Sequence, residues 1–397
     1  MPHYTYLMVG AGMTADAAAR GIRELDRTGT IGVIGAEQDA PYARPPLSKG
    51  LWKGEPIASI WRNTTELDAD LHLGRRATSV DLQARRVTDD RGMQYTFNRL
   101  LFATGGTPRR LPLNDDEVIY FRTLGDYRRL RALADQGKTF AVIGGGFIGS
   151  EIAAALAQHG CHVTMLFPDD GIGARVFPSD LARHLVDYYR EKGVDVRSTE
   201  RVTALNRRGS QTIVQTESGF RLAVDAVVAG IGIVPNVELA SAAGLAVDDG
   251  IIVDKHLMTA QAGVYAAGDV ARFNAPLLGR HIRVEHEDNA LSMGRAAGRA
   301  MAGDVTSYAH LPFFYSDLFD RGYEAVGELE PRGEVVADWK EKFVEGVIYY
   351  LSHGRVRGVL LWNTWGQLDA VRALIAEPGP FEARDLKGRV NAAAIAT

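Results

Sequence analysis

The sequence predicts an α/β protein with two βαβ-based domains followed by a smaller α+β domain. A buried strand-like run, a glycine-rich turn and an alanine-rich helix follow one another at the N-terminus, and the same series begins again at Thr139. After each series the chain returns to an apolar strand that ends in glycine. From Leu329 onward apolar and polar residues alternate with period two, which is typical of an antiparallel sheet.

Composition narrows the class of protein. The chain has 397 residues, enough for about two to four domains of roughly 100–200 residues each. Its formal net charge of −4 provides no basic field, so we expect neither nucleic acid nor an anionic membrane as a partner. There is no apolar run of about 18 residues, and the N-terminus enters a strand without a signal-peptide pattern. We therefore expect a soluble, cytoplasmic protein without a membrane span.

The cysteine content limits the redox chemistry. Cys161 is the one cysteine of the sequence. It cannot form an intrachain disulfide, a redox-active pair or a thiolate-rich metal site, and no metal site is expected. Cys161 is interpreted as a small buried residue at the start of a strand in the second βαβ unit. Any redox chemistry must therefore be carried by a bound cofactor or by this single thiol.

The first βαβ unit opens the chain. Tyr4–Val9 is apolar on both faces, as in a buried parallel strand. A turn at Gly10–Gly12 leads into a helix over Ala15–Leu25, and Thr30–Gly35 forms the second strand. This order of elements is that of a nucleotide-binding half-domain.

The first glycine turn has the GxGxxA spacing of a dinucleotide site. Gly10 permits the tight turn, Gly12 leaves the backbone bare for a pyrophosphate, and Ala15 lets helix and strand pack closely. The helix N-terminus offers free N–H groups to the phosphates. Glu37, just past the second strand, is the acid expected to bind the ribose hydroxyls. The alternative is a purely structural turn.

A second βαβ unit begins with a strand over Thr139–Ile143. The helix that follows runs through Ala157, and His162–Phe167 is the second strand. Gly144, Gly146 and Gly149 between strand and helix match the stricter GxGxxG spacing. The pattern predicts a second dinucleotide site, and hence two Rossmann-like domains.

The residues after this second strand bear on the choice of coenzyme. Asp169 is the candidate ribose acid, and the alternative is that Asp169 and Asp170 are solvated turn residues. A carboxylate here repels a 2′-phosphate, so NADH is favoured over NADPH. Arg175 nearby could weaken that preference.

The remaining elements are shorter. Leu100–Arg109 and Val227–Asn236 are apolar strands that close the two domains. Ala77–Val87 and Gln211–Val224 alternate as antiparallel strands do, and Gly263–Asp269 is a further buried strand.

The C-terminal part alternates in three segments and then becomes helical. The segments are Glu334–Ala337, Lys342–Leu351 and Val356–Leu361, and a helix is expected over Trp365–Ala376. The alanine-rich last residues are expected to be frayed.

At this point the chain resembles the two-dinucleotide-binding-domain flavoprotein reductases, which are glutathione-reductase-like in fold. The resemblance rests on Pro41–Lys49 (PYARPPLSK), Phe121–Asp126 (FRTLGD) and Ala267–Asp269 (AGD). Within the family the chain is similar to the apoptosis-inducing-factor branch, and more distantly to ferredoxin and rubredoxin reductases. The segments that indicate this branch are Leu166–Pro168, Val284–His286, Phe314–Asp317, Gly322–Ala325 and Leu361–Asn363.

Three departures from that branch limit what the resemblance implies. Tyr315 stands where the branch has a tryptophan, and Glu287 replaces the histidine that follows Val-Glu-His. The segment between Leu329 and Lys342 is too short for the long insertion of the animal proteins. We also expect neither the presequence nor the membrane anchor of the mitochondrial proteins, so a nuclear, DNA-degrading role is not implied.

The resemblance implies three domains: a discontinuous FAD-binding domain over 1–113 and 239–310, an NAD(H)-binding domain over 114–238, and a C-terminal domain over 311–397 that covers the flavin. FAD would be bound by Gly10, Gly12, Ala15, Glu37, Arg44, Lys49, Val80, Thr104, Gly105, Arg122, Gly268, Asp269, Glu285, His286 and Tyr315. NAD would be bound by Gly144, Gly146, Phe147, Ile148, Gly149, Glu151, Asp169, Arg175, Gly232, Glu324 and Asn363.

Four residues are candidates for a direct part in catalysis. Lys49 and Glu151, on the first turn of the second fingerprint helix, are expected to pair beside the flavin and to orient the nicotinamide; the alternative is an ordinary surface ion pair. Phe147 is a candidate gate over the flavin face, or else a core residue. His286 begins a predicted helix, Glu285–Arg299, whose N-terminus would face the flavin.

The implied activity is that of an FAD-dependent NADH oxidoreductase. A hydride passes from NADH to FAD, and electrons leave the reduced flavin directly for a ferredoxin, a rubredoxin, a quinone or oxygen. Ser48 occupies the loop in which related peroxidases and CoA-disulfide reductases need a cysteine. The alternative is a redox-responsive binding protein with a long-lived flavin–nicotinamide charge-transfer complex and slow NADH oxidation. A homodimer is compatible with the sequence.

Overall fold

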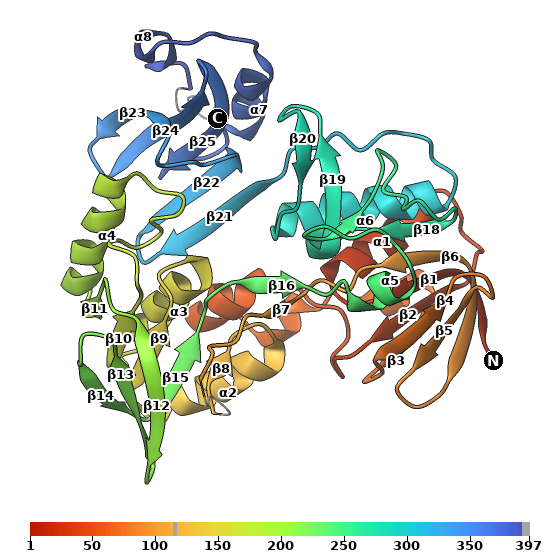
Figure 1. Cartoon of the computed structure of the whole chain (residues 1–397), viewed down its shortest axis with the longest axis horizontal. Coiled ribbons are helices and arrows are strands. Elements are labelled where there is room, and N and C mark those ends of the chain that lie inside the picture. Colours follow the sequence, from red (N-terminus) through yellow and green to blue (C-terminus); the bar gives the residue numbers. More distant parts are fainter. Residues whose placement is uncertain (114–116, 391–397) are drawn as a thin grey trace. The chain divides into compact units, whose positions relative to one another are not determined.

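The computed structural model describes residues 1–113 and 117–390 (Figure 1). They form two compact units. Unit 1 comprises Met1–Arg44, Pro56–Thr107 and Val234–Pro312, and unit 2 comprises Pro45–Glu55, Pro108–Ile233 and Phe313 onward. The division into three domains stays a prediction. Within the described residues, no helix is both long and apolar enough to cross a membrane.

Unit 1 is built on a sheet of seven strands in the order β3-β2-β1-β6-β5-β4, with β18 also paired to β6. The strands are β1 (His3–Val9), β2 (Ile31–Gly35), β3 (Ala69–Leu73), β4 (Ala77–Asp81), β5 (Arg86–Asp89), β6 (Gln94–Phe102) and β18 (Val264–Ala266). Met8 lies opposite Val33 on one side and Leu101 on the other, both in parallel register. The first predicted βαβ unit is confirmed, with the helix α1 at Met13–Arg23.

Two helices of unit 1 pack unusually closely. The helix α6 (Glu287–Met301) lies against α1, and glycines form the contact. A Cβ on Gly298 would lie 2.0 Å from the carbonyl oxygen of Ala18, and one on Gly294 would lie 2.5 Å from that of Thr14. The predicted start of this helix at Glu285 was wrong: the helix begins at Glu287, and His286 is its N-cap.

The rest of unit 1 consists of short elements. They are η3 (Ile57–Ile60), η4 (Thr64–Leu67), α5 (Glu238–Ala242), β17 (Ile251–Ile252), η5 (Gly268–Val270), β19 (Ala271–Ala275) and β20 (Arg280–Ile282). The buried carboxylate of Asp16 on α1 accepts hydrogen bonds from Arg62 Nε at 2.6 Å and Thr64 Oγ1 at 2.8 Å. Asp16 thus fixes the loop between β2 and β3 to the first helix.

Unit 2 contains a second parallel sheet, in the order β11-β10-β9-β15-β8. Its elements are β8 (Ile119–Tyr120), α2 (Leu124–Ala134), β9 (Phe140–Ile143), α3 (Phe147–Gln158), β10 (Val163–Leu166), α4 (Ser179–Glu191), β11 (Asp195–Arg197) and β15 (Ala226–Ala229). The second predicted βαβ unit is therefore confirmed. Cys161 comes two residues before β10 (Val163–Leu166) and is half-buried, so the expectation of a buried residue at the start of that strand was wrong.

An antiparallel sheet of three strands covers this parallel sheet. It consists of β12 (Val202–Arg208), β13 (Gln211–Thr216) and β14 (Arg221–Val224). The alternation over Gln211–Val224 predicted β13 and β14, and β12 was not predicted. Val214 and Val224 on it share one apolar core with Ala141, Leu166 and Val227 of the parallel sheet.

The C-terminal part of unit 2 is an antiparallel sheet in the order β21-β22-β25-β24-β23. The strands are β21 (Phe313–Leu318), β22 (Arg321–Gly327), β23 (Glu334–Glu341), β24 (Glu345–Ser352) and β25 (Arg355–Trp362), and the helices α7 (Leu368–Ala376) and α8 (Ala383–Leu386) follow. The first two strands were not predicted, and α7 begins later than the expected Trp365. The last alanine-rich residues lie outside the described part of the chain.

Short segments carry the chain from one unit to the other. They include β7 (Gly106–Pro108) and β16 (Ile233–Pro235), which pair with each other (Figure 1). The two short helices η1 (Pro45–Ser48) and η2 (Gly50–Lys53) belong to unit 2, although the residues on either side of them belong to unit 1.

Candidate active site

A buried carboxylate, Glu151, lies at the centre of the candidate site in unit 2. Its side chain is 4% exposed and forms an ion pair through Oε1 with Nζ of Lys49. Ser316 Oγ donates to the same oxygen at 2.5 Å, and Ser48 Oγ donates to Oε2 at 2.6 Å. A buried charge is stable only when it is paired and hydrogen-bonded, and Glu151 meets both conditions.

The sequence around Lys49 fixes the backbone that carries its ammonium group. The N–H of Lys49 bonds to the carbonyl of Pro46 at 3.2 Å, and its own carbonyl accepts from the N–H of Trp52 at 3.0 Å. Trp52 Nε1 closes the loop on the carbonyl of Leu47 at 2.8 Å. Nζ of Lys49 also lies 5.2 Å from the ring centroid of Tyr315, a cation–π distance. The lysine is therefore held from three directions.

The structure decides between the two interpretations of the Lys49–Glu151 pair. The side chains are 12% and 4% exposed, so the alternative of an ordinary surface ion pair was wrong. The placement of Glu151 on the first turn was also slightly wrong, because α3 begins at Phe147 and Glu151 is its fifth residue.

Aromatic side chains surround this cluster. The ring of Phe147 lies 5.2 Å from that of Phe314 and 6.5 Å from that of Tyr323. Burial, together with the negative charge of Glu151, raises the pKa of Tyr323 and of Tyr189 well above the usual value. Both phenols therefore stay protonated at neutral pH and cannot act as bases.

The glycines of the second fingerprint have the geometry that a dinucleotide needs. Gly144 has φ +120°, and a Cβ on it would lie 2.4 Å from the carbonyl oxygen of Gly230. A Cβ on Gly149 would lie 2.0 Å from the carbonyl oxygen of Gly144. At Gly146, the N-cap of α3, a Cβ would meet nothing within 4 Å. The backbone at the start of α3 thus faces open space, where a pyrophosphate fits.

The structure shows the surroundings of three further residues predicted to bind NAD. The first, Ile148, is the second residue of α3, and the other two follow β10 in the sequence. Ile148 is 38% exposed, which is unusual for isoleucine and consistent with a side chain that faces a ligand. Asp169 lines a pocket of about 340 Å³ with Asp170, Arg175 and Arg332. The structure thus brings two of the predicted NAD residues, Asp169 and Arg175, to one cavity.

Gly232 and Asn363, two other predicted NAD residues, lie elsewhere in unit 2. Gly232 has φ +93°, and its carbonyl accepts from the N–H of Arg109 at 2.9 Å. The side-chain amide of Asn363 joins two backbone segments: Oδ1 accepts from the N–H of Gly322 at 2.7 Å, and Nδ2 donates to Val344 at 2.8 Å. The structural role of Asn363 is clear, and its contact with a coenzyme stays a prediction.

Glu324, also predicted near NAD, faces away from the Glu151 cluster. Neighbouring residues of a strand point to opposite faces, and Tyr323 points toward Phe147. Burial raises the pKa of Glu324, against the opposing effects of the Gly366 N–H and Arg372. Among the described residues, nothing hydrogen-bonds its buried Oε2. A role for Glu324 toward NAD stays a prediction.

The first fingerprint, in unit 1, shows the same close-packed turn as the second. Gly10 has φ +110°, and a Cβ on it would lie 2.1 Å from the carbonyl oxygen of Ala103. A Cβ on Gly12 would meet nothing within 4 Å, and Ala15 is fully buried beneath the turn. The residues present fit a second dinucleotide at this helix N-terminus.

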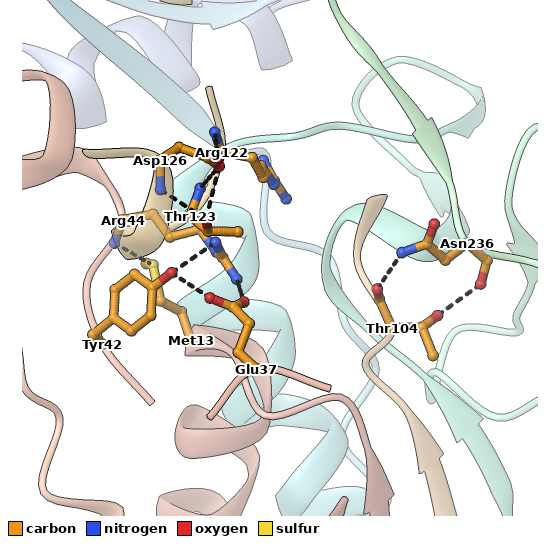
Figure 2. Close-up of polar contacts among 9 residues, drawn as sticks. All are labelled: Met13, Glu37, Tyr42, Arg44, Thr104, Arg122, Thr123, Asp126 and Asn236. Atoms are coloured by element: carbon orange, nitrogen blue, oxygen red, sulfur yellow. Dashed lines mark hydrogen bonds and ion pairs between the residues drawn. The ribbon is translucent and has the colours of Figure 1, made fainter. Parts of the chain in front are cut away.

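The predicted ribose acid of this fingerprint, Glu37, is engaged by two side chains (Figure 2). Its Oε2 accepts from the phenol of Tyr42 at 2.6 Å, and Oε1 accepts from Nη2 of Arg44 at 2.5 Å. The backbone N–H of Arg44 lies 3.3 Å from Sδ of Met13 on α1. Glu37 and Arg44, predicted as separate FAD contacts, are thus parts of one cluster next to the fingerprint helix.

Thr104 and Gly105 are joined to Asn236, which the sequence did not single out (Figure 2). Thr104 Oγ1 donates to the carbonyl of Asn236 at 2.8 Å, and Asn236 Nδ2 donates back to the carbonyl of Thr104 at 2.8 Å. The N–H of Asn236 also bonds to the carbonyl of Gly105 at 3.0 Å. Asn236 therefore fixes the backbone at the end of β6.

Arg122, a predicted FAD residue, belongs to unit 2 and precedes a capping box. Its backbone N–H donates to Oδ2 of Asp126 at 3.1 Å, and Asp126 also accepts from the N–H of Thr123 at 2.7 Å (Figure 2). The start of α2 thus fixes the backbone at Arg122. Val80 is half-buried in β4, opposite Val87.

The start of α6 brings together the remaining FAD candidates. Gly268 has φ +76°, and a Cβ there would lie 2.3 Å from Oγ1 of Thr14. Arg283 Nη1 donates to the carbonyl of Asp269 at 3.2 Å and to Glu285 at 2.8 Å.

His286 caps α6 next to these residues. Burial lowers the pKa of His286 to about 4, although the charges of Asp269 and Asp288 act to raise it. The imidazole is therefore neutral at physiological pH.

Sequence reasoning missed several members of these clusters. They are Ser48, Ser316, Tyr42, Asn236 and Arg332. Ser48 directly precedes Lys49, and Ser316 lies within the recognised Phe314–Asp317 segment, so the sequence could have indicated both. Arg332 carries no local signal that could have found it.

Comparison with known proteins identifies the family. The model of the family described as "Pyridine nucleotide-disulphide oxidoreductase" matches residues 4–294. The ferredoxin–NAD(+) reductase component of the anthranilate 1,2-dioxygenase system of Burkholderia cepacia is 38% identical over 96% of this chain and 97% of its own length. Apoptosis-inducing factor 1 of Dictyostelium discoideum is 30% identical, over 96% of this chain and 79% of its own.

A solved structure agrees with this assignment. The putidaredoxin reductase in a covalent complex with putidaredoxin superposes with a TM-score of 0.89 and 31% identity, over 97% of this chain and 95% of that one. The predicted α/β fold is confirmed. The protein is a nicotinamide-nucleotide-dependent oxidoreductase without a redox-active cysteine pair of its own, since Cys161 is its single cysteine. The chain belongs to the pyridine nucleotide-disulphide oxidoreductase family.

Proposed function

We propose that this protein is an FAD-dependent NADH oxidoreductase that delivers electrons to a small iron–sulfur protein of the ferredoxin type. The observation that carries the proposal is the buried Lys49–Glu151 pair beside a dinucleotide fingerprint, in a chain with a single cysteine. The relatives that support the acceptor class are the ferredoxin reductase component of a dioxygenase system and a reductase solved with its putidaredoxin partner.

The two fingerprints divide the two nucleotides between the units. In unit 1, Gly10 and Gly12 would receive the FAD pyrophosphate, and Glu37 would bind its ribose. In unit 2, Gly146 and Asp169 would hold NADH in the same way. A flavin held there would supply hydride acceptance from a nicotinamide and release of electrons one at a time.

Lys49 supplies the positive charge of the site. An ammonium group close to a flavin stabilises the negative charge that grows on the ring during reduction. The carboxylate of Glu151 holds that ammonium in one place, and the hydroxyls of Ser48 and Ser316 hold the carboxylate. Because all these partners belong to the protein itself, they hold the ammonium group in a defined position.

The aromatic side chains around Glu151 keep water out. Phe147, Phe314 and Tyr323 pack against one another on the side of α3 that carries Glu151. A hydride donor and its acceptor need close contact in a dry environment, which this wall provides on the unit 2 side.

The one thiol of the chain is unsuited to redox catalysis. Burial raises the pKa of Cys161, and its Sγ lies 3.8 Å from the carbonyl of Ala134. A thiol with a raised pKa is a poor nucleophile, so Cys161 would not relay electrons between a bound flavin and the external acceptor.

A stopped-flow experiment tests the proposal. The holoenzyme is mixed with NADH without oxygen, and the absorbance of FAD is followed before a ferredoxin is added. We expect bleaching within milliseconds and rapid reoxidation by ferredoxin, faster than by rubredoxin, a quinone or oxygen. A long-wavelength charge-transfer band that persists for minutes in air would contradict the proposal and favour a redox-responsive binding protein of the apoptosis-inducing-factor type.

A further inference from the structure

We propose that Arg332 and Arg175 give the NADH site tolerance for a 2′-phosphate, so that Arg332, a residue outside the nucleotide-binding sheet, sets the degree of coenzyme selectivity. The inference rests on the proposed binding of NADH at the second fingerprint. It concerns the end of that site beyond β10, where the structure shows a pocket that the fingerprint alone does not explain.

The pocket has a mixed charge. Its volume is about 340 Å³, and Asp169, Asp170, Arg175, Ser179 and Arg332 contribute to its lining. The residue that follows the second strand of a dinucleotide-binding unit meets the adenosine ribose, so this pocket lies where the 2′-position of the coenzyme would be. A volume of this size is within the range of small-molecule sites.

The four charged side chains of the pocket are not paired off. Within 1–113 and 117–390, the side chains of Arg175, Arg332, Asp169 and Asp170 themselves make no ion pair and no hydrogen bond to another residue. Their formal charges sum to zero. Two carboxylates alone would repel a 2′-phosphate, whereas two guanidinium groups provide the planar donors that suit phosphate oxygens.

The loop that carries Arg175 is firmly held. The N–H of Gly173 bonds to the carbonyl of Gly145 in the fingerprint at 2.8 Å, and the phenol of Tyr350 donates to the carbonyl of Val176 at 2.6 Å. The ring of Phe177 lies 5.1 Å from that of Tyr323 and at a right angle to it. The fingerprint and the C-terminal sheet therefore both fix the position of Arg175.

The loop between β22 and β23 is fixed as well. Glu328 and Arg357 join by an ion pair at 2.9 Å and by a backbone hydrogen bond from the N–H of Glu328, also at 2.9 Å. The N–H of Arg332 donates to the side chain of Glu330 at 3.1 Å. The N–H of Gly333 donates to the backbone carbonyl of Glu330. The backbone at Arg332 is thus a defined turn at the pocket, and the C-terminal sheet contributes to nucleotide recognition.

Binding of two nucleotides without nicotinamide tests the inference apart from turnover. Isothermal titration of the holoenzyme gives the Kd of ADP-ribose and of 2′-phospho-ADP-ribose. We expect Arg332→Ala to raise the Kd of 2′-phospho-ADP-ribose by about tenfold and the Kd of ADP-ribose by less than about threefold. Arg175→Ala should act in the same direction, and Arg332→Lys should restore part of the affinity for the phosphate.

A matched control removes a different exposed arginine of unit 2. Arg208→Ala, at the end of β12, should change neither Kd. If Arg332→Ala weakens both ligands equally or neither, or if the wild type does not bind 2′-phospho-ADP-ribose, the inference is wrong while the NADH site stands. If the wild type does not bind ADP-ribose either, the proposed NADH site itself is wrong. Thermal unfolding of each variant separates a lost contact from a lost fold.

Discussion

Ser316 Oγ donates a hydrogen bond to Glu151 Oε1 at 2.5 Å, although 165 residues separate the two in sequence. Ser316 lies on the edge strand β21 and is 1% exposed, and Glu151 lies on the fingerprint helix α3. The C-terminal sheet therefore supplies a hydrogen bond to a carboxylate on the nucleotide helix. Together with Ser48, it lets a carboxylate remain paired with Lys49 in a buried place.

Removing the Ser316 hydroxyl should loosen Glu151 without removing a charge. Hydrogen bonds to charged groups contribute about 1.5–3 kcal/mol, so Ser316→Ala should lower the free energy of unfolding by about that amount. We also expect flavin reduction by NADH to slow several-fold while FAD stays bound. Chemical unfolding and stopped-flow absorbance measure the two effects. Ser210→Ala, in an exposed turn, is the control and should change neither. Unchanged reduction kinetics in Ser316→Ala would show that the hydroxyl has only a structural role.

The Lys49–Glu151 pair can be tested by comparing one substitution with two. Glu151→Ala leaves a buried ammonium unpaired, which should destabilise the protein by about 3–5 kcal/mol and slow flavin reduction, while FAD stays bound. The double change Lys49→Met with Glu151→Leu replaces the pair by apolar groups and should recover most of the stability. It should not recover the rate. If the double variant reduces flavin as fast as the wild type, the pair has no part in hydride transfer.

The sequence predicted the fold well where local signals are strong. Both βαβ units were found, because Tyr4–Val9 and Thr139–Ile143 are apolar on both faces and lead into glycine turns. The strands β21 and β22 were missed. Phe313–Tyr315 is aromatic at three successive positions, so no period-two alternation marks the start of β21. Aromatic side chains occupy both faces of this segment: Phe313 and Tyr315 stack on each other, and Phe314, between them in sequence, contacts Tyr323. No polar face therefore marks the start of the strand in the sequence.

The candidate site was predicted only where a residue type has a fixed place in a motif. The sequence predicted that Glu151 and Lys49 pair, and the structure brings them into contact. Their hydroxyl partners Ser48 and Ser316 were not, because a serine has many possible partners and long-range packing selects one. Arg332 was even harder to predict from the sequence, because the pocket that it lines forms only when β22 and β23 fold beside the loop that carries Arg175.

The carboxylate of Asp169 predicts a preference for NADH. A negative charge at the ribose end of the pocket repels the 2′-phosphate of NADPH, and the two arginines of the pocket limit the size of the effect. We expect the wild type to have the higher kcat/KM with NADH. Asp169→Asn should raise kcat/KM for NADPH and so lower the ratio of kcat/KM with NADH to kcat/KM with NADPH by about three- to tenfold. Steady-state kinetics with an artificial acceptor measure both coenzymes. Equal kcat/KM values in the wild type would show that Asp169 does not act as the selective acid.

His286 predicts how stability depends on pH. Burial at the start of α6 lowers its pKa to about 4, below the value of about 6.5 expected in the unfolded chain. Between these values the unfolded state binds the proton more tightly, so stability is complete above about pH 6.5 and falls as the pH drops toward 4. The loss attributable to His286 is on the order of 3 kcal/mol. Asp288, whose charge acts on His286, also contacts His310 Nε2 at 2.5 Å. Unfolding free energies of the wild type and of His286→Asn, measured from pH 7 to pH 4.5, isolate the contribution of His286. The variant should lose less stability over this range, with His310→Asn as the control for the neighbouring ring. Parallel pH profiles for the wild type and His286→Asn would mean that the imidazole is not buried in the neutral form.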